Sequence, residues 1–268
     1  MKMLFQMIKR FFKDRFHDQS ALMAYFFMLS IFPFLIFVMS LLGYLPIYSS
    51  DVLSAIQPFV PARSYRLIEN NLVSILDERR TRLTFFSFLA AFWLASMAVQ
   101  ALVRAMNDAY HITRKEGFLK ALLKDLFLTA ILVVTLTLSL LIPILEEVAH
   151  IFLSAQTDVP FSFQTWAALK WAIGSLYLFV LFTFVYKLVP SAGIPFSSVL
   201  PGSLFATVSW QAMSVGYSYY VSYASYSQLY GQLGSIIVLM IWFYFSAAVL
   251  LFGGLINAAR IEKERVRT

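Results

Sequence analysis

Cysteine is absent from this chain, and charged residues make up only 13% of it. Without cysteine there is no disulfide, no thiolate metal site, no cysteine nucleophile and no lipid anchor on a cysteine. The scarcity of charge, against 60% hydrophobic residues, excludes a soluble domain with a solvated surface. The hydrophobic residues form long continuous runs instead of short alternations, which predicts an all-α polytopic membrane protein and not a barrel.

Common signatures of enzyme chemistry are also missing. No glycine is followed by Lys-Ser or Lys-Thr, so a phosphate-cradling loop and direct ATP coupling are not expected. His17, His111 and His150 lie in separate segments and lack metal-ligand spacing. Glu146 and Glu147 are adjacent, and adjacent side chains on a helix diverge, so they form a poor cation site. We therefore expect that the protein is not an enzyme and that it binds no cofactor and no metal ion.

The hydrophobic runs divide into six expected transmembrane helices within a single domain covering 1–268. Each run is long enough for about 20 apolar residues, the length that crosses a bilayer. None has an acid or base at its centre, which disfavours a proton- or sodium-coupled carrier. The expected spans are about 21–45, 83–107, 126–145, 164–188, 202–221 and 233–259.

Basic residues near the ends of these spans set the expected orientation. With both termini in the cytoplasm, fifteen lysines and arginines lie inside and six outside, as the positive-inside rule requires. We therefore attribute the net charge of +7 to topology and lipid contact, and expect no nucleic acid partner. Two amphipathic helices are expected along the membrane surface, at the N-terminus with Leu4, Ile8, Phe11 and Phe12 on one face, and at 65–76. For the N-terminus the alternative is a loosely ordered basic tail.

Three groups of residues are candidates for a substrate site. Gln100, Arg104 and Asn107 share a helical face that could bind an anionic head group, or simply anchor a helix end. Ser30 and Pro33 could form a ligand-binding break in the first span, or an ordinary proline kink.

The third candidate lies in the longest uncharged stretch, between Lys187 and Arg260. Its tyrosines share a face if the helix continues that far, and they suit either an amphiphilic substrate or an external aromatic belt. Two glycines then separate the fifth span from the sixth. The residues concerned are Tyr219, Tyr223, Tyr226, Tyr230, Gly231 and Gly234.

Four segments resemble the YihY/virulence factor BrkB family, in the same order and over about residues 15 to 260. They are ALMAYFFMLSIFPFLIF, ALVRAMNDAYHI, PGSLFATVSW and YGQLGSIIVLMIWFYFSAAVLLFGGLINA. The resemblance implies a six-helix inner-membrane protein of a family often labelled ribonuclease BN-like, with roles suggested in serum resistance or transport. The resemblance assigns a catalytic role to none of the residues in the family's motifs. These residues are Ser30, Pro33, Arg104 and Asn107 in the first half, and Tyr230, Gly231, Gly234, Trp242, Gly253 and Asn257 in the second.

The sequence predicts a transporter or flippase-like protein for an amphiphilic or lipid-like substrate, and the resemblance implies that it lies in a bacterial cell (inner) membrane. An internal cavity lined by the first, second and fifth spans is expected. The alternative is a non-transporting protein that organises lipids or partner proteins. Membrane lipids with anionic head groups are the expected partners. A ribonuclease is disfavoured because the chain has neither a carboxylate cluster nor a histidine pair for phosphodiester cleavage.

Overall fold

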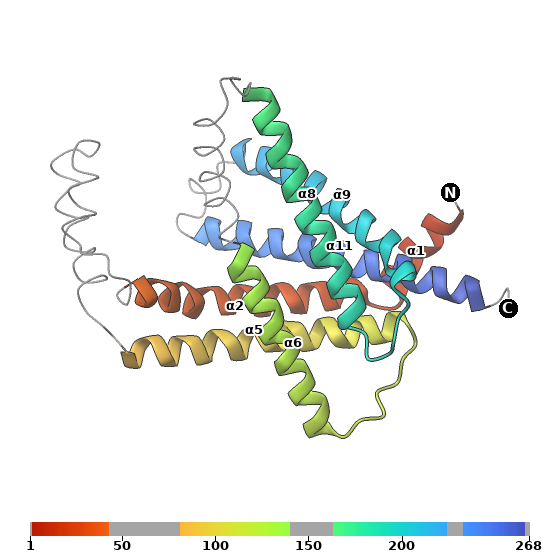
Figure 1. The fold of residues 1–268 in the computed structure, drawn as a ribbon, viewed down its shortest axis with the longest axis horizontal. Helices are drawn as coiled ribbons and strands as arrows, with labels where there is room; N and C mark the ends of the chain where they lie inside the picture. Colours follow the sequence, from red (N-terminus) through yellow and green to blue (C-terminus); the bar gives the residue numbers. More distant parts are fainter. Residues whose placement is uncertain (1, 43–80, 140–162, 224–232, 266–268) are drawn as a thin grey trace, which may run out of the picture. The chain divides into compact units, whose positions relative to one another are not determined.

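The computed structural model describes residues 2–42, 81–139, 163–223 and 233–265, and all regular structure within these ranges is helical. Figure 1 shows the seven described helices in chain order. They are α1 (Lys2–Lys13), α2 (Phe16–Leu42), α5 (Thr81–Ala109), α6 (Phe118–Ser139), α8 (Phe163–Leu188), α9 (Phe196–Tyr223) and α11 (Leu233–Arg265). The all-helical prediction is confirmed for these ranges.

Each of the six expected spans overlaps one of these helices. Four segments are long and apolar enough to cross a membrane, and they are Phe16–Val38, Thr81–Ala109, Ala168–Leu188 and Gly234–Glu264. The described parts of α6 and α9 do not meet this criterion of length and hydrophobicity. The six-span arrangement therefore stays a prediction, and so does the surface helix at 65–76, which lies outside the described residues.

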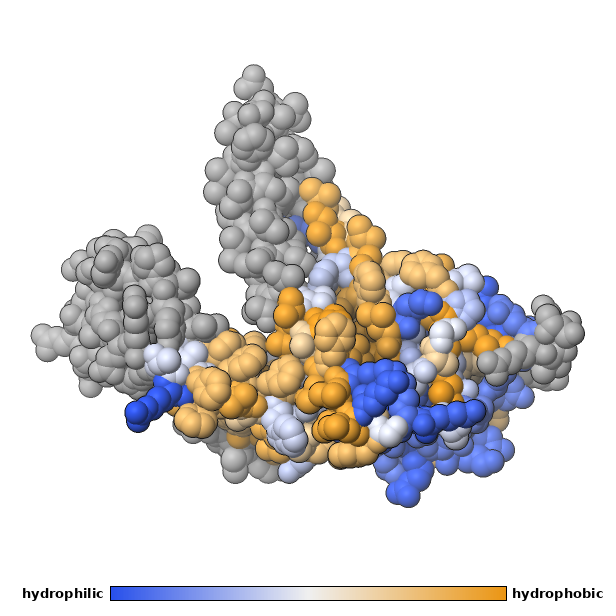
Figure 2. Space-filling view, turned by 60° about the horizontal axis from the view of Figure 1, so that its bottom comes forward, coloured by the Kyte–Doolittle hydropathy of each residue, from blue (hydrophilic) through white to orange (hydrophobic). Residues whose placement is uncertain are grey.

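Two compact units make up the chain, one of Met1–Tyr25 with Ser96–Thr268 and one of Phe26–Ala95. In the larger unit, α9 packs against both α8 and α11, and α1 packs against α11 (Figure 1). In the smaller unit, the rings of Phe37 on α2 and Phe88 on α5 lie 5.2 Å apart. Figure 2 shows hydrophobic residues (orange) over the helix bodies and hydrophilic residues (blue) gathered toward the side on which α1 and the end of α11 lie in Figure 1.

Local hydrogen bonds explain where two helices end or continue. The end of α5 is closed by His111, whose φ of 55° is left-handed, together with a bond from the Ile112 N–H to the Asn107 carbonyl. In contrast, α2 continues through Pro33, and the Ser30 hydroxyl donates to the carbonyl of Phe27 at 2.8 Å. The helix at Ser30 and Pro33 is therefore unbroken, and the serine hydroxyl is satisfied within the same helix.

Close contact between glycines holds α9 against α11. A Cβ on Gly202 would lie 2.2 Å from the carbonyl oxygen of Gly253, so the two backbones approach too closely for any side chain. Asn257 is fully buried beside them, and its Oδ1 accepts a hydrogen bond from the Gly202 N–H at 2.7 Å. The buried Tyr186 of α8 donates to the carbonyl of Leu250. Small residues and interhelical hydrogen bonds of this kind hold helices together where hydrophobic driving force is weak.

Candidate functional site

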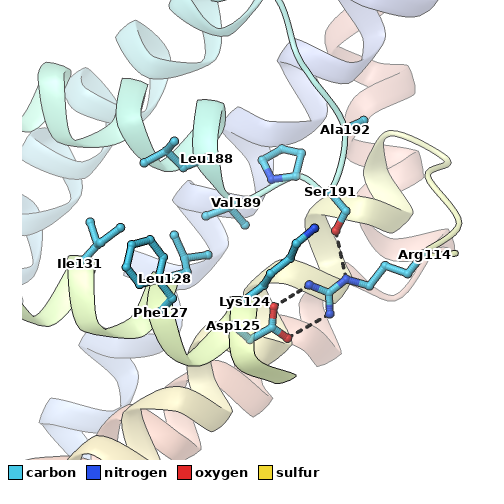
Figure 3. Close-up of a pocket in the computed structure, with 11 residues that line it drawn as sticks. Arg114, Lys124, Asp125, Phe127, Leu128, Ile131, Leu188, Val189, Ser191 and Ala192 are labelled. Atoms are coloured by element: carbon cyan, nitrogen blue, oxygen red, sulfur yellow. Dashed lines mark hydrogen bonds and ion pairs between the residues drawn. The ribbon is translucent and has the colours of Figure 1, made fainter. Parts of the chain in front are cut away.

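A pocket of about 320 Å³ opens where α6 begins and α8 ends, in the larger unit (Figure 3). That volume is at the lower end of the range for ligand sites, enough for a head group and a short length of hydrocarbon. Two kinds of side chain line it on opposite sides. The polar ones are Arg114, Lys124, Asp125 and Ser191, and the apolar ones include Phe127, Leu128, Ile131, Leu188 and Val189.

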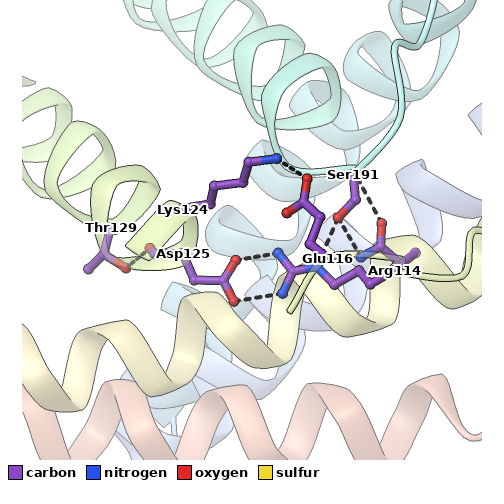
Figure 4. Close-up of polar contacts among 7 residues, drawn as sticks. Arg114, Glu116, Lys124, Asp125, Thr129 and Ser191 are labelled. Atoms are coloured by element: carbon purple, nitrogen blue, oxygen red, sulfur yellow. Dashed lines mark hydrogen bonds and ion pairs between the residues drawn. The ribbon is translucent and has the colours of Figure 1, made fainter. Parts of the chain in front are cut away.

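An ion pair forms the centre of the polar side. The guanidinium of Arg114 donates two hydrogen bonds to the carboxylate of Asp125, at 3.0 and 2.5 Å, and a third from Nε to the Ser191 hydroxyl at 3.0 Å (Figure 4). Asp125 is buried, and its hydrogen bonds to Arg114 raise the pKa of that guanidinium above its ordinary value. Arg114 therefore keeps its positive charge at every physiological pH, and its two bonds to Asp125 hold that charge in a fixed position at the edge of the pocket.

The loop after α8 is fixed to α5 by Asn107. The amide of Asn107 donates to the Ser191 hydroxyl at 2.9 Å and accepts from the Ser191 N–H at 2.8 Å. The same loop is closed by a hydrogen bond from the Lys187 ammonium to the carbonyl of Ile194. At the start of α6, Lys124 pairs with Glu116 of the preceding loop (Figure 4). The polar wall is thus preorganised by contacts from α5, α6 and α8.

The apolar side of the pocket continues onto the outer surface of two helices. Phe127 of α6 and Leu188 of α8 line the pocket and are also exposed, whereas Leu128 and Val189 line it and are buried. A molecule with its head group against Arg114 could therefore extend its hydrocarbon along this surface. Such an arrangement suits an amphiphile at a membrane boundary.

The sequence-predicted face on α5 is placed near this pocket but does not line it. Asn107 is buried and supports Ser191, whereas Arg104 is exposed and Gln100 is half-buried. The pocket is lined by α6, the end of α8 and the loops beside them, whereas the cavity expected between the first, second and fifth spans stays a prediction. Sequence reasoning missed Arg114 and Asp125 because eleven positions, including a glycine, separate them, and they looked like ordinary charges of a connecting loop.

The other predicted site residues lie elsewhere. Tyr219 and Tyr223 are exposed and line no described pocket, while Gly234 is buried near the start of α11. Ser30 and Pro33 belong to the smaller unit. Tyr226, Tyr230 and Gly231 lie outside the described residues. The buried Asn257 is a structural contact between α9 and α11.

No group of three or more histidine, aspartate or glutamate side chains that could hold a metal ion occurs in the described ranges. The polar side of the pocket contains only one carboxylate, Asp125, and both of its oxygens are bonded to Arg114. The site can bind charged and hydrophobic groups together, but the described part offers no set for general acid and base catalysis.

Comparison with known proteins agrees with this membrane architecture. A family model described as Virulence factor BrkB matches residues 7–268. The chain is 36% identical to a Bacillus subtilis protein, YfkH, whose name calls it ribonuclease-like, over 99% of this chain and 98% of that protein. Membrane proteins named UPF0761 from Alkalilimnicola ehrlichii and Aliivibrio salmonicida are 27% and 24% identical, covering 91% and 96% of this chain and 55% and 82% of theirs. No solved structure matches. The chain therefore belongs to the virulence factor BrkB family of membrane proteins.

Proposed function

We propose that this protein binds an amphiphilic, lipid-like molecule in the pocket at the start of α6 and moves it across the membrane, as a transporter or flippase-like protein. The observation that carries the proposal is the division of one pocket into a charged wall at Arg114 and an apolar wall at Phe127 that runs onto the helix surface. The lining contains two cations, Arg114 and Lys124, and one carboxylate, Asp125, so we propose an anionic head group that competes with Glu116 for Lys124.

We further propose that this pocket lies at the cytoplasmic face of a bacterial inner membrane. Within the larger unit, hydrogen bonds bring the end of α5 to the loop after α8 through Asn107, and to α1 and the end of α11 through Arg10. Lys124, at the start of α6, lies at the same end of these helices. The positive-inside rule places such a cluster of basic residues in the cytoplasm. The variant Lys263→Cys contains a single cysteine, because the chain has none of its own. This cysteine should react with an impermeant maleimide only after the cell membrane is opened.

A reconstituted protein tests the transport step. Proteoliposomes containing a fluorescent phosphatidylglycerol should lose inner-leaflet fluorescence to external dithionite faster than protein-free vesicles. Phe127→Ala, which removes the exposed apolar wall, should slow that loss. Phe118→Ala is the matched control, because Phe118 is also exposed on α6 but does not line the pocket.

The same experiment separates transport from the alternative, a non-transporting protein that organises lipids. The exposed positions of Tyr219 and Tyr223, away from the described pocket, favour that alternative. If lipid remains bound in native mass spectrometry but wild-type vesicles flip no faster than empty ones, transport is ruled out and binding remains. If Phe118→Ala impairs flipping as much as Phe127→Ala, the pocket is not the site.

We propose that the protein is not an enzyme, although one relative is named ribonuclease-like. The charged wall of the pocket is a closed pair between Arg114 and Asp125, with no described histidine lining it. Protein purified to homogeneity should therefore leave a labelled RNA intact. Cleavage that disappears with Asp125→Asn, while the variant keeps its fold, would contradict this proposal.

A further inference from the structure

The first helix presents two different apolar faces. On one face, Met7 and Phe11 are buried, and the ring of Phe11 lies 5.9 Å from that of Phe252 on α11. On the other, Phe5, Ile8 and Phe12 are 71%, 42% and 59% exposed. The spacing of three and four residues places these three on one side of the helix. The sequence had grouped Ile8 and Phe12 with Phe11, whereas packing against α11 separates them.

Basic residues flank the exposed face. Lys9 and Lys13 are exposed on its edge, and neither has an ion-pair partner among the described residues. The acidic residue of the adjoining turn, Asp14, is engaged by Arg10 at 3.2 Å. The outer half of α1 therefore carries a hydrophobic strip beside two free positive charges.

Arg10 fixes the rotation of α1. Its guanidinium donates to the carbonyl of Ala109 at the end of α5, at 2.8 Å, and to Glu262 of α11 at 3.2 Å. His111 lies 2.9 Å from the same guanidinium. Arg10 thus points toward the ends of α5 and α11. Phe5, Ile8 and Phe12 lie on the opposite side of α1, so they face away from those two helix ends.

We infer that α1 is a lipid-binding element, with Phe5, Ile8 and Phe12 immersed in the acyl region of the bilayer and Lys9 and Lys13 at the phosphates of an anionic leaflet. Charge complementarity selects this occupant, since a hydrophobic strip edged by unpaired lysines matches an anionic membrane surface. The inference concerns a surface apart from the pocket, and it stands or falls independently of transport.

Labelling at single cysteines tests the inference in the full-length protein. Phe5→Cys, Ile8→Cys and Phe12→Cys, each with a nitroxide, are reconstituted in vesicles of phosphatidylglycerol and phosphatidylcholine. Phe184→Cys, exposed on α8, provides the bilayer reference, and Lys263→Cys provides the aqueous reference. Relaxation by oxygen should exceed relaxation by a nickel chelate at the three α1 positions, as at Phe184. If relaxation at the three α1 positions instead resembles that at Lys263→Cys, the inference is overturned.

The lysines are tested with the label at Phe12. Replacing Lys9 and Lys13 by glutamine should lower the ratio of immersed to aqueous label in phosphatidylglycerol vesicles by about 25-fold, which corresponds to roughly 1 kcal/mol per lysine at an anionic surface. An unchanged ratio overturns the role of the anionic leaflet. Dipolar broadening that disappears on dilution with unlabelled protein would place a second copy of the chain against α1, and would also overturn the inference.

Discussion

At the crossing of α9 and α11, a Cβ on Gly202 would lie 2.2 Å from the Gly253 carbonyl oxygen, and the amide of Asn257 occupies the remaining space. At the start of α6, by contrast, Arg114 and Asp125 pair at the edge of an open pocket of about 320 Å³. Both are polar places in a hydrophobic chain. The crossing leaves no space between the two helices and fixes them against each other, whereas the pocket leaves open space next to charged side chains. We therefore expect substitutions at the crossing to change stability and substitutions at the pocket to change binding.

The largest effect is expected from Gly202→Ala. The added methyl group collides with backbone that cannot move aside, so the free energy of unfolding should fall by about 3 kcal/mol or more, the upper end for overpacking. Gly216→Ala is the matched control on the same helix, since its Cβ would meet no atom within 4 Å. That control should gain about 0.5–1 kcal/mol. Thermal unfolding in detergent measures both, and equal melting temperatures would contradict the close crossing.

A smaller effect is expected from Asn257→Ala. The substitution leaves the buried Gly202 N–H without its side-chain acceptor, at a cost of about 1–3 kcal/mol. Asn107→Ala also removes hydrogen bonds, those with Ser191, but Ser191 is exposed and water can replace them. Its cost should stay near 1 kcal/mol. A larger loss of stability for Asn107→Ala than for Asn257→Ala would reverse the contrast between the two regions.

Lipid binding should respond to the edge of the pocket at Lys124, whose ammonium also pairs with Glu116. Lys124→Gln should weaken retention of phosphatidylglycerol about fivefold, the factor for roughly 1 kcal/mol per basic side chain near an anionic lipid. Lys120→Gln makes the same charge change one turn earlier on α6, outside the pocket lining. Native mass spectrometry of the two variants measures retention. Equal loss for both would mean that general charge, and not the pocket, holds the lipid.

The smallest effect concerns acid pH at the loop before α6. The hydrogen bond from Lys124 lowers the pKa of Glu116 below its ordinary value of 4.5. Because the folded pKa is lowered, the contact stabilises the protein above that ordinary value and is lost as the pH falls through the lowered one. The difference in melting temperature between wild type and Glu116→Gln should therefore be small at pH 7 and shrink further as the pH falls below 4.5. A difference that grows on acidification would contradict the contact.

Much of the fold could be predicted from sequence, because uncharged runs of membrane length leave helices as the only way to satisfy the backbone. The end of α8 near Leu188 was anticipated in this way, and the N-terminal helix was anticipated from its amphipathic pattern. Helix ends were less predictable. The closure of α5 at His111 depends on a left-handed residue, and histidine, unlike glycine, gives no strong signal for it.

The candidate site was largely beyond prediction. Asn107 was selected as a ligand-binding residue on a helix face, yet its amide is used by Ser191, a residue of a distant loop. Arg114 and Asp125 were not selected, because nothing in their spacing shows that the loop turns back and brings them together. Spacing predicts which residues share a helix face but not which helix end meets which loop.

By itself, the amino-acid sequence determined that this is a helical membrane protein without cysteine chemistry, and its motifs determined the family. Those properties depend on composition and on local backbone satisfaction, which each segment carries within itself. Only the tertiary structure decided that Gly202 and Asn257 form a closed contact, that Arg114 and Asp125 edge a pocket, and that Phe11 turns inward while Phe12 turns outward. These outcomes depend on which surfaces of separate helices meet, and packing at that level is a property of the assembled chain.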